Sequence, residues 1–362
     1  MAANADDFDV LIAGGQVVDG SGNPWRYVDV ALGGDRIAAV APPGTLAGRA
    51  TETVEAAGMV VCPGFIDIQS HSIVPFLSDR RALSKVTQGV TTDIMGEAWT
   101  PAPFGGKIAA PFPAEDRGRI GTDYDEWDRI GRTWRRFGDW LADLERRGVS
   151  INVGSFIGSG TVREYGMGYA LGDAGPDELA TMRAVVADAM RDGAFGLATA
   201  LIYPPGSYAG TDEIAALCEV VANFHGVHIT HMRSEEARIL DALGETIEIA
   251  RRTGVATEIY HLKAAGQRNW GLMAEVIRRI DAARAAGIDV TADMYPYVAA
   301  GTGLASCLPP WAEADGKLWD NLRDPDARAR IRRAMAEPAA DWASLAVNAG
   351  PDHVVLAGLL RP

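Results

Sequence analysis

Residues 226–261 read GVHITHMRSEEARILDALGETIEIARRTGVATEIYH, and this stretch decides the fold class. Its first five residues have the pattern of a buried strand, and that strand ends at His231. Apolar residues at helical spacing follow over 236–252, and a second strand then ends at His261. A strand, a helix and a strand within about 30 residues form a βα unit, which predicts a parallel sheet.

The same period continues on both sides of this stretch. Helical patterns at 177–193 and 272–286 are each followed by a strand, at 194–198 and 288–293. Polar residues fall repeatedly at the carboxyl ends of the strands, which favours a TIM-like (β/α)8 barrel because barrel sites are built there. An open nucleotide-binding sheet is disfavoured, since no GxGxxG motif follows a strand.

The segments outside these units predict the domain organisation. Residues 1–62 contain short β-branched runs separated by glycine-rich turns, which predicts a small β-sandwich-type domain before a barrel at 63–362. Residues 99–147 are rich in proline, glycine and aromatic side chains, and form either a lid or substrate wall or a surface excursion packed on its own aromatics. A strongly charged helical stretch at about 311–350 resembles an insertion.

The composition is that of an α/β globular protein, with 48% hydrophobic and 23% charged residues among 362. A formal charge of −14 opposes binding to nucleic acid and to anionic membranes. The three cysteines, Cys62, Cys218 and Cys307, lie far apart and indicate neither a disulfide framework nor a cysteine zinc site. With no recognisable signal peptide or membrane span, we expect a cytoplasmic protein, which can be an oligomer.

Three histidines and one glutamate are candidate metal ligands. His231 and His261, one βα unit apart, would converge on one face of a barrel, and His71 follows an earlier strand. Neutral imidazole binds Zn²⁺, and three protein ligands with a water form the usual catalytic arrangement. Glu97 also follows a strand, and would either bind the metal or remain a solvated loop residue. A single histidine at a strand end is more often a hydrogen-bonding residue, so the matched positions carry the metal-site hypothesis.

Several motifs identify a family. The stretch PGFID at 63–67, followed by QGVTT at 88–92, resembles the amidohydrolase superfamily. Later motifs are similar to its N-acyl-D-amino-acid deacylase (D-aminoacylase) branch: GAFGL at 193–197, YPPG at 203–206, THMR at 230–233, HLK at 261–263, NW at 269–270 and YPY at 295–297. These matches span about residues 8–304 in the order of the family.

The resemblance implies a hydrolase acting on C–N bonds other than peptide bonds, which splits N-acyl-D-amino acids into a carboxylate and a free D-amino acid. It implies one or two divalent metal ions, with zinc held by the residues that match His231 and His261. The family's first-strand HxH motif corresponds here to residues 69–71, where Gln69 replaces one histidine. The family's bridging cysteine falls near Ala98, so Glu97 is a candidate substitute ligand.

The implied substrate is a small molecule with a free carboxylate, which would meet Tyr203 and Lys263. Arg233 is a further candidate because of its chemistry and its proximity to His231. The family's general base is an aspartate at the last barrel strand, and we identify no match, so no catalytic residue is assigned.

We therefore expect a chain truncated at its carboxyl end, with a complete protein that lost its activity as the alternative. Two functional alternatives also stay open. One is an inactive remnant with a binding or assembly role, and the other is a related amidohydrolase that acts on cyclic amides or dipeptides.

Overall fold

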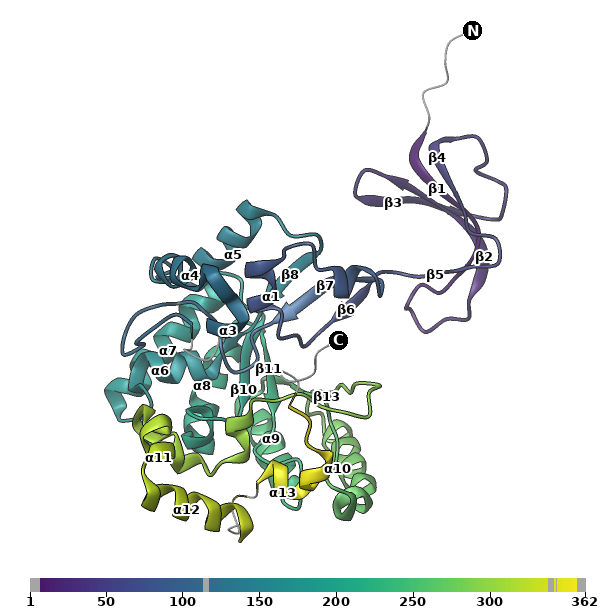
Figure 1. Cartoon of the computed structure of the whole chain (residues 1–362). Helices are drawn as coiled ribbons and strands as arrows, with labels where there is room; N and C mark the ends of the chain where they lie inside the picture. Colours follow the sequence, from purple (N-terminus) through teal and green to yellow (C-terminus); the bar gives the residue numbers. More distant parts are fainter. Residues whose placement is uncertain (1–6, 113–116, 338–341, 343, 357–362) are drawn as a thin grey trace. The chain divides into compact units, whose positions relative to one another are not determined.

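The structure is a computed structural model that describes residues 7–112, 117–337, 342 and 344–356. The chain divides into two compact units (Figure 1), which we call the amino-terminal unit (Met1–Phe65 with Gly89–Thr91) and the main unit (Ile66–Gln88 with Thr92–Pro362). Among the described helices, none is both long enough and apolar enough to cross a bilayer.

The amino-terminal unit contains one mixed sheet. Its central strand β1 (Phe8–Val17) runs antiparallel to β2 (Arg26–Gly33) and parallel to β4 (Ala50–Glu55) and β5 (Val60–Val61), while β2 pairs with β3 (Arg36–Ala41). Three buried residues form its small core: Leu11, Ala31 and Leu46. A sandwich needs a second sheet packed on the first, so the predicted β-sandwich-type domain stays a prediction.

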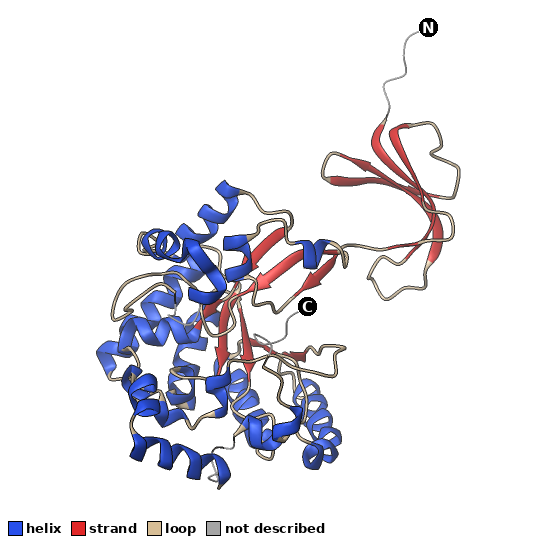
Figure 2. Cartoon of the chain, viewed as in Figure 1, coloured by secondary structure: helices blue, strands red, loops and turns tan. Residues whose placement is uncertain are grey.

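Parallel strands follow one another from β7 (Val90–Met95) to β13 (Val290–Ala292), with helices between and after them, and confirm the α/β class (Figure 2). One sheet has the order β13-β12-β11-β10-β9 and another the order β6-β7-β8. Only Phe156 separates β8 from β9, and its N–H donates to the carbonyl of Met95 at 2.9 Å. The closed (β/α)8 barrel stays a prediction. The strands are β6 (Phe65–Asp67), β7 (Val90–Met95), β8 (Asn152–Ser155), β9 (Ile157–Gly158), β10 (Gly196–Ala200), β11 (Val227–His231), β12 (Ala256–Ile259) and β13 (Val290–Ala292).

Helices alternate with these strands and bury their apolar stripes against them. After β9 come α6 (Ser159–Met167) and α7 (Pro176–Arg191), and α8, α9 and α10 follow β10, β11 and β12 in turn. These three are α8 (Thr211–Asn223), α9 (Ile239–Thr253) and α10 (Met273–Ala285). The helix α9 ends at Gly254, whose φ of +71° suits glycine, as the sequence pattern predicts.

The segment 99–147 contains α3 (Arg117–Ile120), α4 (Tyr124–Gly131) and α5 (Phe137–Arg147). Its aromatic side chains, except that of Phe104, belong to the largest hydrophobic cluster of the main unit, together with residues of α7 and α8. The ring of Trp134, for example, lies 6.2 Å from Phe112 and 6.5 Å from Trp127 between centroids. The segment is therefore part of the core, and its role as a lid or substrate wall stays a prediction.

The remaining helices are short or lie near the carboxyl end. They are α1 (Ile73–Ser78), α2 (Leu83–Val86), α11 (Leu318–Arg323), α12 (Pro325–Ala336) and α13 (Leu345–Ala349). The last three lie in the stretch at about 311–350, which is mostly helical among its described residues, while residues 338–341 and 343 lie outside the described residues.

Candidate metal centre

Neighbouring parallel strands bring His231 and His261 together. A cluster of buried side chains from five successive strands or strand ends fills the space that these strands share: Ile94, Phe156, Ala198, Ile229 and Tyr260. Side chains alternate along a strand, so His231 lies on the same side of β11 as Ile229, one layer closer to the carboxyl end. The Nδ1 atom of His231 lies 3.1 Å from the Nε2 atom of His261, and the two rings are nearly perpendicular at 88°.

The backbone of His261 is held in an unusual conformation. Its φ is +38°, a region that residues with a side chain adopt rarely and that is found often at functional sites. Its N–H donates to Oδ1 of Asp293 at 2.6 Å, just after β13, and the N–H of Leu262 donates to the carbonyl of Asp293 at 2.9 Å. Asp293 therefore fixes the turn that directs the His261 ring toward His231.

The carboxylate of Glu97 reaches the same place from the loop after β7. Its Oε1 atom lies 3.0 Å from Nδ1 of His231, and its side chain is buried, which excludes a solvated loop residue. Its Oε2 atom lies 2.8 Å from Nε2 of His71 and accepts a hydrogen bond from the amide of Gln69. Burial raises the pKa of Glu97, but the bonds from His231 and His71 outweigh it and hold the pKa below its usual value.

A glycine makes this position of Glu97 possible. Gly96 has a φ of +104°, and a Cβ atom there would lie 2.2 Å from the carbonyl oxygen of Phe156. We expect Gly96→Ala to move Glu97 and weaken zinc binding by about 10-fold or more, as misplaced metal ligands do. Competition with a chromogenic chelator measures this. Gly244→Ala is the control, because a Cβ atom there has nothing within 4 Å, and equal zinc affinity of both variants would contradict the prediction.

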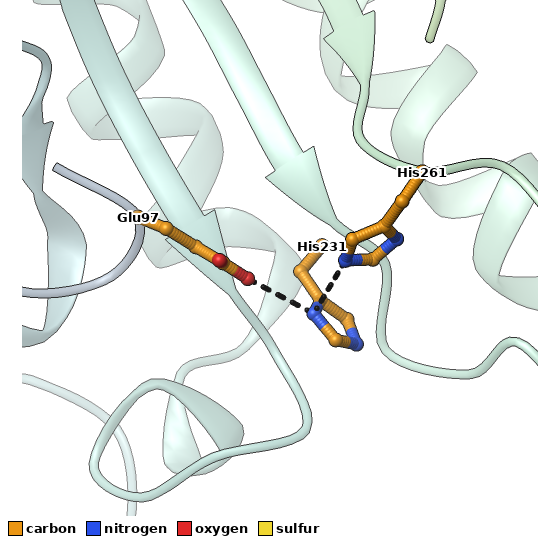
Figure 3. A group of neighbouring side chains, drawn as sticks. All are labelled: Glu97, His231 and His261. Atoms are coloured by element: carbon orange, nitrogen blue, oxygen red, sulfur yellow. Dashed lines mark hydrogen bonds and ion pairs between the residues drawn. The ribbon is translucent and has the colours of Figure 1, made fainter. Parts of the chain in front are cut away.

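Three side chains fit a divalent ion of the size of zinc (Figure 3). Glu97, His231 and His261 each offer one ligand atom, and these atoms lie within 4.8 Å of one another. Bonds of about 2.0–2.1 Å in a tetrahedron separate ligand atoms by about 3.4 Å, close to the 3.0 and 3.1 Å found here. Two imidazoles and one carboxylate are also a donor set of catalytic zinc sites, which keep the fourth position open.

His71 lies beside this group but outside it. It contacts the second oxygen of Glu97, and its side chain is 72% exposed, whereas that of His231 is 6% exposed. The structure therefore brings His71 to the second oxygen of the Glu97 carboxylate and not to the oxygen that faces His231.

The three predicted substrate-binding residues have different surroundings: two lie beside the histidines and one does not. The ring of Tyr203 lies 5.3 Å from that of His231, and burial raises the pKa of its hydroxyl to about 12, so it stays a hydrogen-bond donor. Lys263 Nζ lies 3.0 Å from Nδ1 of His261. Arg233 points elsewhere, because both its Nε and its Nη2 donate to Glu245 at 2.9 Å, and it also donates to the carbonyl of Ala209. It is thus held in a structural network.

One residue of the site was missed by the sequence analysis. Glu235 Oε1 lies 2.8 Å from Nδ1 of His261 and accepts from Nζ of Lys263 at 2.6 Å. Burial raises its pKa, but the bond from His261 and the charges of His231 and Lys263 lower it to about 2. The only signal in the sequence is a glutamate four residues after His231, in a stretch with no regular period.

Comparison with known proteins places the chain in a family. A family model described as the amidohydrolase family matches residues 52–350. The D-aminoacylase of Alcaligenes xylosoxydans xylosoxydans is 37% identical over 305 residues, which are 83% of this chain and 60% of that protein. The N-acyl-D-glutamate deacylase of the same organism is 33% identical over 350 residues, which are 95% of this chain and 67% of that protein.

A solved structure shows the same relationship. The N-acyl-D-glutamate deacylase from Bordetella bronchiseptica, in complex with zinc and a phosphonate mimic of the tetrahedral intermediate, has a TM-score of 0.71 and 30% identity. The match covers 80% of this chain and 59% of that chain, so the chain spans about three fifths of such relatives. The chain belongs to the amidohydrolase family, in its branch of D-aminoacylases and N-acyl-D-amino-acid deacylases.

Proposed function

We propose that this chain carries the metal site of an enzyme that hydrolyses N-acyl-D-amino acids to a carboxylate and a free D-amino acid. The observation that carries the proposal is the convergence of Glu97, from the loop after β7, with His231 and His261 at the carboxyl ends of the neighbouring parallel strands β11 and β12. The relatives are deacylases, and one of them holds zinc, which supports the same metal here. We propose that this site belongs to a TIM-like barrel at 63–362, and that residues 1–62 form a separate small β domain.

The chain would hold one or two zinc ions through these side chains. Bound zinc supplies a Lewis acid and lowers the pKa of a coordinated water toward neutrality. Glu97 would contribute one oxygen to the ion shared with His231 and His261, and its other oxygen faces His71. No general base is assigned among the described residues, and the aspartate expected from the family stays a prediction.

Tyr203 and Lys263 would bind the free carboxylate of the substrate. A phenolic hydroxyl and an ammonium both donate hydrogen bonds, and those to a carboxylate are charge-assisted. Lys263 already pairs with Glu235, and both groups lie at the edge of the metal site. Arg233 is not part of this proposal, since Glu245 holds its guanidinium.

The proposed function is tested by turnover of the purified protein with added zinc. Hydrolysis of N-acetyl-D-amino acids that a chelator abolishes, with little hydrolysis of their L-enantiomers, would support the proposal and exclude the inactive remnant. Zinc binding without turnover would favour the inactive remnant with a binding or assembly role. Preferential turnover of hydantoins or dipeptides would favour the related amidohydrolase reaction instead.

The carboxylate-binding role of Lys263 has its own test. We expect Lys263→Met to raise KM for N-acetyl-D-amino acids by about 10–100-fold, because a hydrogen bond to a charged group contributes about 1.5–3 kcal/mol. Lys107→Met is the control, since Lys107 forms an exposed ion pair with Glu178. If methyl esters of the substrates were hydrolysed as well as the acids, the role would be refuted.

A further inference from the structure

Two groups of opposite character compete for one nitrogen of His261. Its Nδ1 atom lies 2.8 Å from Oε1 of Glu235 and 3.0 Å from Nζ of Lys263. An ionised carboxylate only accepts hydrogen bonds, whereas an ammonium only donates them. A neutral imidazole carries one proton, so Nδ1 either donates to Glu235 or accepts from Lys263, and the outcome decides which nitrogen is left with a lone pair.

The metal site requires one of these two outcomes. The Nε2 atom of His261 is the one directed at His231 and Glu97, 3.1 Å from Nδ1 of His231. Its lone pair is free for a metal ion only when the proton lies on Nδ1. Pairing with Lys263 alone would place the proton on Nε2 and block the site.

The surroundings favour the proton on Nδ1. Lys263 has two other acceptors, since its Nζ atom donates to Glu235 at 2.6 Å and to the carbonyl of His261 at 3.1 Å. Two of the three donors of its ammonium are therefore paired without the ring. Oε1 of Glu235 already accepts from the ammonium of Lys263 at 2.6 Å and lies 2.8 Å from Nδ1 of His261, so this carboxylate oxygen offers Nδ1 an acceptor. When Nδ1 of His261 donates to Glu235, the ring proton has an acceptor and the ammonium of Lys263 keeps its two others.

We propose that Glu235 is a positioning residue that selects the Nδ1–H tautomer of His261 against Lys263 and thereby keeps Nε2 free to bind a metal ion. Carboxylates that hydrogen-bond the second nitrogen of a metal-binding histidine fix its tautomer and orientation in this way. The inference rests on the metal site of the proposed function, and adds a residue that controls its occupancy.

Glu235 also lies next to the second histidine. Its Oε2 atom is 3.8 Å from Nε2 of His231, which is buried and has no hydrogen-bond partner among the described residues. When a metal ion takes Nδ1 of His231, the proton of that ring must lie on Nε2, beside this carboxylate oxygen. The carboxylate of Glu235 thus faces Nδ1 of His261 and Nε2 of His231, on the side of both rings away from Glu97.

The tautomer is read directly in the metal-free protein. Two-bond ¹H–¹⁵N spectra of protein labelled in its histidines distinguish protonated from unprotonated ring nitrogens, and His261→Asn assigns the signals. We expect the parent protein to carry the proton on Nδ1 of His261. In Glu235→Ala and in the isosteric Glu235→Gln we expect it on Nε2, because the ammonium of Lys263 then becomes the dominant neighbour. Spectra are compared at a pH at which the ring signals no longer shift.

Zinc affinity is the second measurement. We expect both variants to bind Zn²⁺ about 10–100-fold more weakly than the parent, by chelator competition. Removing the competing donor in Glu235→Ala/Lys263→Met should restore part of this loss, whereas a merely structural role for Glu235 would make the double variant no better than the single one. Glu248→Gln, on the exposed face of α9 beside Arg251, is the control for loss of a carboxylate and should change neither measurement.

Two outcomes would overturn the proposal: the proton remaining on Nδ1 in both Glu235 variants, or zinc affinity equal to that of the parent. A failure of the proposed function would give a different experimental result from a failure of this inference. If the parent protein bound no Zn²⁺ at all, the deacylase proposal would fall, and the spectra of the metal-free protein would still decide whether Glu235 sets the tautomer of His261.

Discussion

Replacing His231 with alanine is expected to reduce the affinity for zinc by at least about 100-fold, because even the loss of an outer partner of a metal ligand costs about 10–100-fold. His231 is central to the site, since its Nδ1 atom lies 3.0 Å from Oε1 of Glu97 and 3.1 Å from Nε2 of His261. Its removal leaves two donors, and two donors do not form the three-ligand site of a catalytic zinc ion. Isothermal titration with Zn²⁺ and chelator competition both measure this.

Replacing a histidine outside the site provides a matched control for the loss of the His231 side chain. His225 is exposed and has a φ of +56°, a conformation that asparagine tolerates well. We expect His225→Asn to bind zinc as the parent does. If His231→Ala retained the zinc affinity and stoichiometry of the parent, the assignment of the metal site would be wrong.

The second large effect is on stability. Arg163 of α6 and Glu213 of α8 form an ion pair in which the side chains are 1% and 5% exposed, and Arg163 also donates to the carbonyl of Gly172. Removing one partner of a buried pair leaves an uncompensated charge. We therefore expect Glu213→Gln to lower the free energy of unfolding by about 3–5 kcal/mol, measured by urea denaturation.

An exposed pair provides the comparison. Glu248 and Arg251 pair on the surface of α9, where exposed ion pairs contribute little, so Glu248→Gln should change stability by less than about 0.5 kcal/mol. Equal destabilisation by the two substitutions would show that burial does not set the contribution of the Arg163–Glu213 pair.

The local periodicity of the sequence was sufficient to predict much of the fold. The helical pattern at 236–252 corresponds to α9 at Ile239–Thr253, and the pattern at 272–286 to α10 at Met273–Ala285. The same periodicity placed His231 and His261 at equivalent strand ends, and parallel strands align such ends because their register is shared. In the amino-terminal unit the periodicity predicted strands but not their order, since β1 pairs in parallel with β4, which follows two intervening strands.

The sequence by itself determined the α/β class, the alternation of strands and helices, and the two histidines, because these follow from patterns a few residues long. Only the tertiary structure decided which side chains complete the site. Glu97 meets His231 across 134 residues, and Asp293 holds His261 across 32, through loops whose paths follow no period. The tertiary structure also decides the direction in which each side chain points. Arg233 faces Glu245, while Glu235, two residues later, faces both histidines. Such choices depend on the charges that packing brings close, and these are absent from any local pattern.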